Sequence, residues 1–257
     1  RDFCLSRGLG DVYKRQACEA LELGSVDMAV VDMAQLIRME KNDENLPYGV
    51  VISGVLKRGD SRYVMIRKRH AKDLIENAVV ATDSYSKTER IKHMYDGISC
   101  VVETDIRKCI EKLDASECDA VFVLLEDIKA ARLHNSFLYR YTIMDYGECV
   151  PVHGEGVYAM LTKGKKEAVR TARELSHKST AECFEIEDDI ISRVMQNVYV
   201  KTCDVYARIS SDRLEIYADV TGNRGRIRVN ERGTFVNKNL IICLLYTSDA
   251  ADDRISV

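Results

Sequence analysis

The sequence predicts an α/β protein that ends in a small α+β unit. Residues 17–31 have the pattern of a helix, a glycine and a buried strand, and residues 105–125 have a helix, a turn and a strand. Alternation of this kind is typical of α/β folds. Near the end of the chain, three strand-like runs within residues 198–230 are separated by turn residues. That spacing favours a small antiparallel sheet.

Each α/β element is indicated by its own local pattern. Short apolar runs bounded by turn residues indicate strands, and apolar residues three and four apart indicate helices. Residues 119–125 are the most apolar run, which is typical of a central parallel strand buried on both faces. A charged loop is expected over 38–45. The other strands are expected at 26–31, 50–56, 63–66, 79–84, 98–102 and 157–161, and the helices at 17–23, 84–94 and 105–113.

The junction of strand 79–84 and helix 84–94 is a candidate ligand site. Small hydroxyl residues there precede a helix start, where free N–H groups and the helix dipole both favour an anion. Thr82, Ser84 and Lys87 are therefore candidate binding residues, whereas Asp83 would repel a carboxylate. The helix is expected to turn Thr88, Arg90 and Lys92 outward.

Two further turns are candidate hinges. Pro151 has no N–H, and Gly154 and Gly156 tolerate positive φ, so a tight turn precedes the apolar run 157–161. Taken alone, this is a loop that feeds a buried strand. The charged residues of the other turn, on the same reasoning, are a solvated group with weak ion pairs. They are Arg58, Asp60 and Arg62.

The last third of the chain has a different pattern. A basic link at 163–166 is expected to be a solvated linker, and helical patterns cover 167–175 and 187–195. The strands that follow are expected at 198–209, 213–220 and 226–230.

Composition excludes several classes of function. The formal net charge of −3 argues against a nucleic-acid footprint, which needs a concentrated basic face. No apolar run approaches the ~18 residues of a membrane span. The nine cysteines include no C-x-x-C pair and no metal spacing, so we expect free thiols, no metal site and a cytoplasmic, reducing location.

The two ends of the chain are expected to be non-native. Residues 1–16 and 242–257 resemble translated adapter sequence of the kind found on assembled metagenomic fragments, so they are excluded from fold reasoning. On this interpretation an N-terminal part of the natural protein is missing.

Four phrases in the sequence resemble porphobilinogen deaminase, also called hydroxymethylbilane synthase. They are E-A-L-x-x-G-x-V-D-M-A-V from Glu19, L-P-x-G-x-V-I-x-x-V-L-x-R-x-D-x-R from Leu46, K-L-D-x-x-E-x-D-A-V-x-x-L from Lys112, and P-x-x-G-E-G-x-x-A-M from Pro151. The resemblance implies two α/β lobes like those of periplasmic binding proteins, the first incomplete, plus a C-terminal α+β domain with a three-stranded antiparallel sheet. It implies domain 1 at 17–57 and 150–163, domain 2 at 58–149, and the C-terminal domain at 164–241.

The same resemblance places the family's chemistry on substituted positions. The catalytic acid position is Gln35, and the neighbouring lysine position is Ala34. The cysteine that would carry a dipyrromethane cofactor falls on Tyr199, and Cys203 is the alternative attachment site. The resemblance makes Arg58, Asp60, Arg62, Gly154 and Gly156 hinge residues and makes Thr82, Ser84 and Lys87 substrate-binding residues.

These substitutions leave three hypotheses for the function. The first is a transferase of tetrapyrrole (porphyrin, heme) biosynthesis that condenses four porphobilinogen units with release of ammonia. The second, which the substitutions favour over the first, is a pseudoenzyme without the dipyrromethane cofactor, whose cleft binds a pyrrole or another anionic small molecule. The third is an interaction subunit without a ligand. In each case the resemblance implies a monomer.

Overall fold

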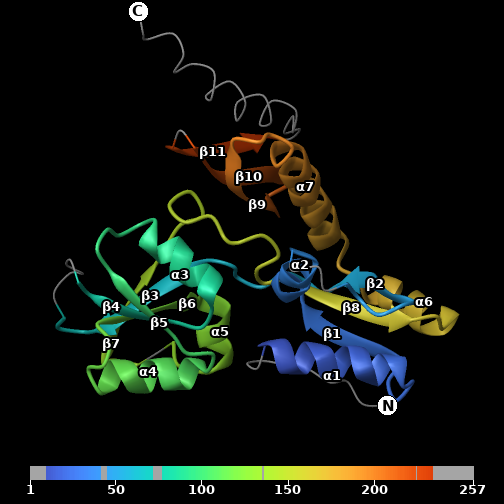
Figure 1. The fold of residues 1–257 in the computed structure, drawn as a ribbon, viewed down its shortest axis with the longest axis horizontal. Coiled ribbons are helices and arrows are strands. Elements are labelled where there is room, and N and C mark those ends of the chain that lie inside the picture. Colours follow the sequence, from blue (N-terminus) through green and yellow to red (C-terminus); the bar gives the residue numbers. More distant parts are fainter. Residues whose placement is uncertain (1–9, 42–44, 72–76, 135, 224, 234–257) are drawn as a thin grey trace, which may run out of the picture.

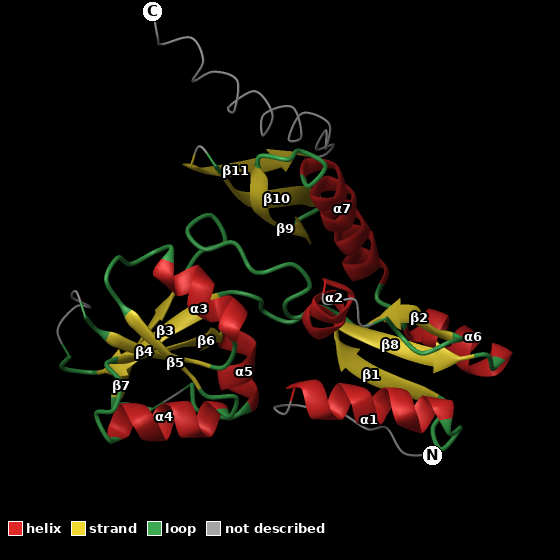
Figure 2. Cartoon of the chain, in the orientation of Figure 1, coloured by secondary structure: helices red, strands yellow, loops and turns green. Residues whose placement is uncertain are grey.

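Figure 1 shows the computed structural model of the protein, which describes residues 10–41, 45–71, 77–134, 136–223 and 225–233. Three sheets organise these residues, and the helices pack on them (Figure 2). Among the described helices, none is long and apolar enough to cross a membrane.

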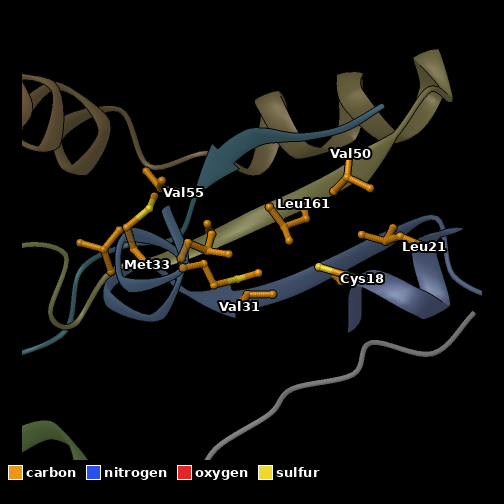
Figure 3. Close-up of a cluster of buried hydrophobic side chains, with 12 residues drawn as sticks. Cys18, Leu21, Val31, Met33, Val50, Val55 and Leu161 are labelled. Carbon is orange, nitrogen blue, oxygen red and sulfur yellow. The ribbon is translucent and has the colours of Figure 1, made fainter. Parts of the chain in front are cut away.

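The first lobe is built on a three-stranded sheet of order β1-β8-β2, in which both pairings are antiparallel. Its core lies between this sheet and α1, where Cys18 and Leu21 meet Val31 and Leu161 (Figure 3). On its other face α6 packs so closely on β2 that a Cβ added to Gly54 would lie 2.7 Å from the Ala172 carbonyl oxygen. The elements of this lobe are α1 Gly10–Glu22, β1 Met28–Asp32, α2 Met33–Lys41, β2 Val50–Val55, β8 Tyr158–Lys163 and α6 Lys166–Leu175.

The second lobe is built on a five-stranded sheet of order β5-β4-β6-β3-β7. Strand β4 is parallel to β5 and β6, whereas β3 is antiparallel to β6 and β7. All residues of β6 are buried, because helices cover both faces of the sheet's centre. The elements are β3 Tyr63–Lys68, β4 Val79–Thr82, α3 Tyr85–Lys92, β5 Ser99–Val102, α4 Ile106–Asp114, β6 Ala120–Leu124, α5 Leu125–Ala130 and β7 Tyr139–Ile143.

The C-terminal unit is a long helix on a three-stranded antiparallel sheet of order β11-β10-β9. The side chains of Ile190 and Val194 on α7 pack on Val205 and Ile216 of the sheet. Its elements are α7 Lys178–Val194, β9 Val200–Ser210, β10 Arg213–Gly222 and β11 Gly225–Gly233. The predicted α/β class with a small C-terminal α+β unit is confirmed.

Several local predictions need correction. The charged loop expected at 38–45 is wrong for residues 38–41, which continue α2, because Met33, Leu36 and Met39 form a buried stripe at helical spacing. Strand β7 was not expected. On α3, Thr88 and Arg90 are buried instead of outward.

The sequence-based boundary at 164 assigns α6 to the C-terminal domain, but α6 packs on the first sheet, where Ala172 contacts Val30 and Met160. Of the segments expected to be non-native, residues 10–16 form the start of α1. The remainder of both segments lies outside the described residues.

Candidate functional site

Charged residues gather where the first lobe meets the second. Asp32 ends β1, Asp83 follows β4, and Asp127 follows β6 within α5. In open α/β sheets, ligands bind outside the carboxyl ends of the strands. We call the group formed by Asp32, Asp83, Lys87 and Glu155 the interlobe cluster; Asp127 and Arg38 lie at its border.

Asp32 is fixed at the first turn of α2. Its Oδ1 accepts a hydrogen bond of 3.1 Å from the Gln35 backbone N–H, which is the geometry of a helix N-cap. The Met33 N–H donates to the Val157 carbonyl oxygen at 2.8 Å. The connection that precedes β8 is therefore held against the start of α2.

Gly154 and Gly156 shape that connection, and both have positive φ, +83° and +73°. A Cβ added to Gly154 would lie 2.9 Å from the Ala34 backbone nitrogen, and one added to Gly156 would lie 2.4 Å from Ser61 Oγ. Only glycine fits such close approach at positive φ. Glu155, between them, is fixed on both sides.

Lys87 is buried and engaged by Asp83. Its Nζ lies 2.7 Å from Asp83 Oδ1, one helical turn away. Burial alone would lower the pKa of Lys87, but the carboxylates of Asp83, Glu155 and Asp127 outweigh burial and raise it. Lys87 therefore stays charged and is not a free anion-binding group.

Thr82 and Ser84, the other two candidate binding residues, lie in different surroundings. Thr82 has no exposed surface, and its hydroxyl donates to the Ser84 carbonyl oxygen at 3.1 Å. The Ser84 Oγ lies 3.4 Å from Ser86 Oγ. Ser86 in turn accepts a hydrogen bond of 3.3 Å from Arg38 of α2, across the lobe junction.

Glu155 is the most unusual member of the cluster, since the residue is only 6% exposed. No described residue donates a hydrogen bond to its carboxylate or pairs with it. Burial, with the charges of Asp32 and Asp83, raises the pKa of Glu155 to about 7, although Lys87 and Arg38 oppose the shift. Burial likewise raises the pKa of Asp32. Near neutral pH the cluster therefore holds protons as well as charge.

The two arginines among the predicted hinge residues form ion pairs with different carboxylates. Arg58 forms a two-pronged ion pair with the fully buried Glu187 of α7, at 2.5 and 2.9 Å. Arg62 instead pairs with Asp60 in its own turn, at 2.9 and 2.8 Å. Burial opposes the charge of Asp60, but the hydrogen bonds from Arg62 outweigh it and hold the pKa of Asp60 at about 2. Arg58 thus ties the interlobe connection to the C-terminal unit.

A second charged contact joins α3 of the second lobe to the C-terminal sheet. Arg90, 6% exposed, donates to Asp219 at 2.9 Å and to Asp204. Asp219 also pairs with Arg226. These contacts explain why Arg90 is buried, although sequence patterning assigned it to solvent. Thr88 is buried instead beside Thr82 of its own lobe, and Lys92 is exposed as predicted.

The positions tied to family chemistry lie on different elements. Gln35 lies in the first turn of α2, beside Asp32. Tyr199 is 53% exposed, just before β9. Cys203 is 7% exposed in β9 and belongs to the core under α7. The structure therefore brings Lys87 and Gly154 close to the Gln35 turn and places the two attachment positions in or just before β9 of the C-terminal unit, whose Asp204 accepts a hydrogen bond from the His153 N–H at 3.3 Å.

Sequence reasoning missed Asp32 and Glu155 as site residues. Both stood inside recognised phrases, Asp32 in the segment aligned with the family acid and Glu155 between the two glycines. An acidic residue between two structurally required glycines is the signal that could have identified Glu155.

Comparisons with known proteins identify the family. Residues 6–171 match the family described as "Porphobilinogen deaminase, dipyromethane cofactor binding domain". Porphobilinogen deaminase of Clostridium acetobutylicum is 22% identical over 218 residues, which cover 79% of this chain and 74% of that protein. The Chlorobium luteolum porphobilinogen deaminase is 24% identical over 73% of this chain and 60% of its own length. The chain thus spans from about three fifths to three quarters of these relatives.

Solved structures give weaker likenesses. The aliphatic sulphonate binding protein SsuA of Escherichia coli aligns over 70% of this chain and 61% of its own, at 14% identity and a TM-score of 0.43. The BvgS VFT2 domain of Bordetella pertussis aligns over 66% and 72%, at 14% identity and a TM-score of 0.44. TM-scores this low identify neither a ligand nor an activity.

Proposed function

Since the chain belongs to the porphobilinogen deaminase family, we propose that it keeps the family's architecture as a small-molecule binding protein and does not make hydroxymethylbilane. The observation that carries this proposal is the charge of the interlobe cluster. Asp83 lies 2.7 Å from the buried ammonium group of Lys87, and the charges of Asp32, Asp83 and Lys87 all act on Glu155.

That charge is the wrong sign for a growing pyrrole chain. Each porphobilinogen unit carries carboxylates, and like charges in a desolvated site repel strongly. The family positions on which the resemblance places an acid and a lysine are Gln35 and Ala34, so the proton transfer and charge pairing that they imply are lost here. Lys87 offers no compensation because Asp83 holds it.

The residues present do not fit covalent attachment of dipyrromethane either. The phenol of Tyr199 is a far weaker nucleophile than a thiolate at neutral pH. The thiol of Cys203 packs among Ile216, Val220 and other apolar side chains of the C-terminal core. A cofactor at Cys203 would need that core to open, which would expose the apolar surface that stabilises it.

A turnover assay tests the proposal. The purified full chain is incubated with porphobilinogen, and substrate consumption, ammonia release and linear tetrapyrrole are measured. We expect none of the three above the level without protein. Sustained ammonia release with tetrapyrrole formation would contradict the proposal, and its loss in Cys203→Ser, but not in Cys100→Ser, would assign the attachment site.

The interlobe cluster itself gives no observation in favour of the alternative, an interaction subunit without any ligand.

A further inference from the structure

Strand β7 forms an open edge of the sheet in the second lobe. In the order β5-β4-β6-β3-β7 it pairs with β3, and no described strand lies on its other side. It lies on the side of the second lobe that faces away from the first lobe (Figure 1). It contains no proline, and its five pairs with β3 follow one register without a bulge. Prolines and bulges are two devices that close such an edge to other chains, and β7 has neither.

Backbone groups of β7 point toward this open edge. The Met144 N–H, directly after the strand, donates to the Tyr63 carbonyl oxygen at 3.0 Å and so points toward β3. Because successive residues of an antiparallel strand alternate in the side to which their backbone groups point, those of Ile143 and Tyr141 point away from β3. β7 therefore presents the donors and acceptors with which an added strand could pair.

A groove of about 760 Å³ follows the edge, and its lining includes the consecutive strand residues 139–141. Consecutive strand residues point to opposite faces of a sheet, so a groove that touches all three runs along the edge. The Tyr139 hydroxyl donates to Asp114 Oδ1 at 2.6 Å, and the Tyr141 hydroxyl donates to the Leu133 carbonyl oxygen at 2.5 Å. These bonds fix one wall of the groove before any partner arrives, which lowers the entropy cost of binding.

The groove is basic, and apolar side chains lie at its end. Arg69, Arg140 and His134 are exposed and line it, and none of its described lining residues is acidic. Phe137 and Leu138, directly before β7, are 85% and 70% exposed. Exposed apolar side chains that gather at one place, with polar residues around them, mark interaction sites. The charge of the groove favours an acidic partner.

We propose that β7 is the docking site of a partner protein, which adds an extended acidic segment to this edge as a sixth strand of the sheet. Main-chain hydrogen bonds give the affinity in this mode of binding, and alternate side chains give the specificity. Arg140 points to one face of the sheet, and Tyr139 and Tyr141 point to the other. A matching segment therefore has acidic residues beside Arg140 and apolar residues beside the tyrosines. The inference is independent of the interlobe cluster and of the proposed function.

Two other occupants fit less well. A second copy of β7 would bring positive charge against positive charge, and like charges on paired strands are destabilising. Single-stranded nucleic acid would satisfy the arginines through its phosphates, but its backbone has no alternating N–H and C=O groups to pair with β7. Only the acidic segment uses both the charge and the open edge.

Three peptides test the inference, and calorimetry measures their binding to the full chain. Each has the core Val-X-Val-X-Val-X-Val, in which X is glutamate, glutamine or lysine. We expect saturable binding of the glutamate peptide and binding at least ~10-fold weaker for the other two, because charge-assisted hydrogen bonds are lost. Absence of binding by the glutamate peptide at millimolar concentration would overturn the inference and leave Arg140 as a charge that protects the edge. Equal binding of all three peptides, or tighter binding of a single-stranded thymidine decamer, would also overturn it.

A methylated peptide separates strand addition from charge attraction. Methyl groups on all amide nitrogens of the glutamate peptide remove its main-chain donors and preserve its charge. We expect at least ~10-fold weaker binding, because the peptide can no longer donate to β7. Unchanged affinity would show that no strand is added and would overturn the inference. This comparison needs no change to the chain, so it holds where a variant fails to fold.

Variants of the chain locate the binding. Arg69→Glu and Arg140→Glu place a like charge in the groove and should each weaken binding of the glutamate peptide by at least ~10-fold. Ile143→Pro removes an N–H that points to the open edge, where proline is tolerated in a strand, and should also weaken it. Arg173→Glu, which changes an exposed arginine on α6, is the matched control and should bind like the natural chain. Unchanged affinity in all three groove variants would overturn the inference.

Discussion

Replacing Glu187 with alanine should destabilise the protein more than any surface change. Its carboxylate has no exposed surface and accepts three hydrogen bonds, two from Arg58 at 2.5 and 2.9 Å and one from the Ala207 N–H at 2.7 Å. The Arg58 side chain is 8% exposed, so Glu187→Ala would leave a buried guanidinium without its partner. Removing one partner of a buried ion pair costs about 3–5 kcal/mol, and we expect a loss of that size in the free energy of unfolding.

Urea denaturation measures this loss, and two variants make the result interpretable. Glu174→Ala breaks an exposed pair on α6 and should cost less than about 1 kcal/mol. The double variant Arg58→Met/Glu187→Leu should recover part of the loss, since well-packed apolar residues often replace buried pairs without cost, but the buried Ala207 N–H still lacks its acceptor. A Glu187→Ala loss no larger than that of Glu174→Ala would refute the buried tie between the interlobe connection and α7.

The pH dependence of the Glu187 contribution has a definite sign. Burial alone would raise the pKa of Glu187, but Arg58 and the hydrogen bonds outweigh burial and lower it. A depressed carboxyl pKa stabilises the folded state above the unfolded value of about 4.3. That contribution is lost as the pH falls through the folded pKa, and Glu187→Ala should lack it.

Three other predictions concern the lobe junction. Arg90→Met removes the ion pairs of Arg90 with Asp204 and Asp219 and should lower the free energy of unfolding by about 3 kcal/mol. A variant as stable as the natural chain in urea denaturation would contradict this. Gly154→Ala meets the Ala34 backbone at 2.9 Å and should lower the thermal midpoint more than Gly164→Ala, which has open space at similar φ; equal midpoints would count against tight packing there. Because burial raises the pKa of Glu155 to about 7, the folded state binds more protons, and stability should fall as pH rises from about 4.5 to about 7. Denaturation across this range should show a flatter slope for Glu155→Gln, and identical slopes would refute the shift.

The apolar pattern of the sequence predicted the buried central strands better than it predicted helix α2 and the exposed strand β7. Strand β6 was predicted because an unbroken apolar run is a local signal, and its neighbours confirm burial on both faces. Helix α2 was partly assigned to a loop because Arg38, Glu40 and Lys41 hide a stripe of buried residues three apart. Strand β7 has no buried residue, since its side chains are half-buried or exposed, and it therefore has a weak pattern.

The candidate site was less predictable because its side chains contact residues that lie far away along the sequence. Arg90 meets Asp204 and Asp219, more than a hundred positions along the chain, and no local pattern signals such a contact. Glu155 looks like an ordinary turn residue in sequence, and only the fold shows that it is buried between two closely packed glycines. The resemblance to the family located the right segments, but the carboxylates that distinguish this chain needed the three-dimensional arrangement.

The central claim is that the chain has the framework of the porphobilinogen deaminase family, while neither of the two positions considered for attachment, Tyr199 and Cys203, carries its pyrrole cofactor. Intact-mass measurement of the denatured full chain, after incubation with porphobilinogen, tests this most directly. The account predicts a mass equal to that of the polypeptide alone, because Tyr199 is a phenol and Cys203 is enclosed by the C-terminal core. A covalent increase of two pyrrole units would contradict it.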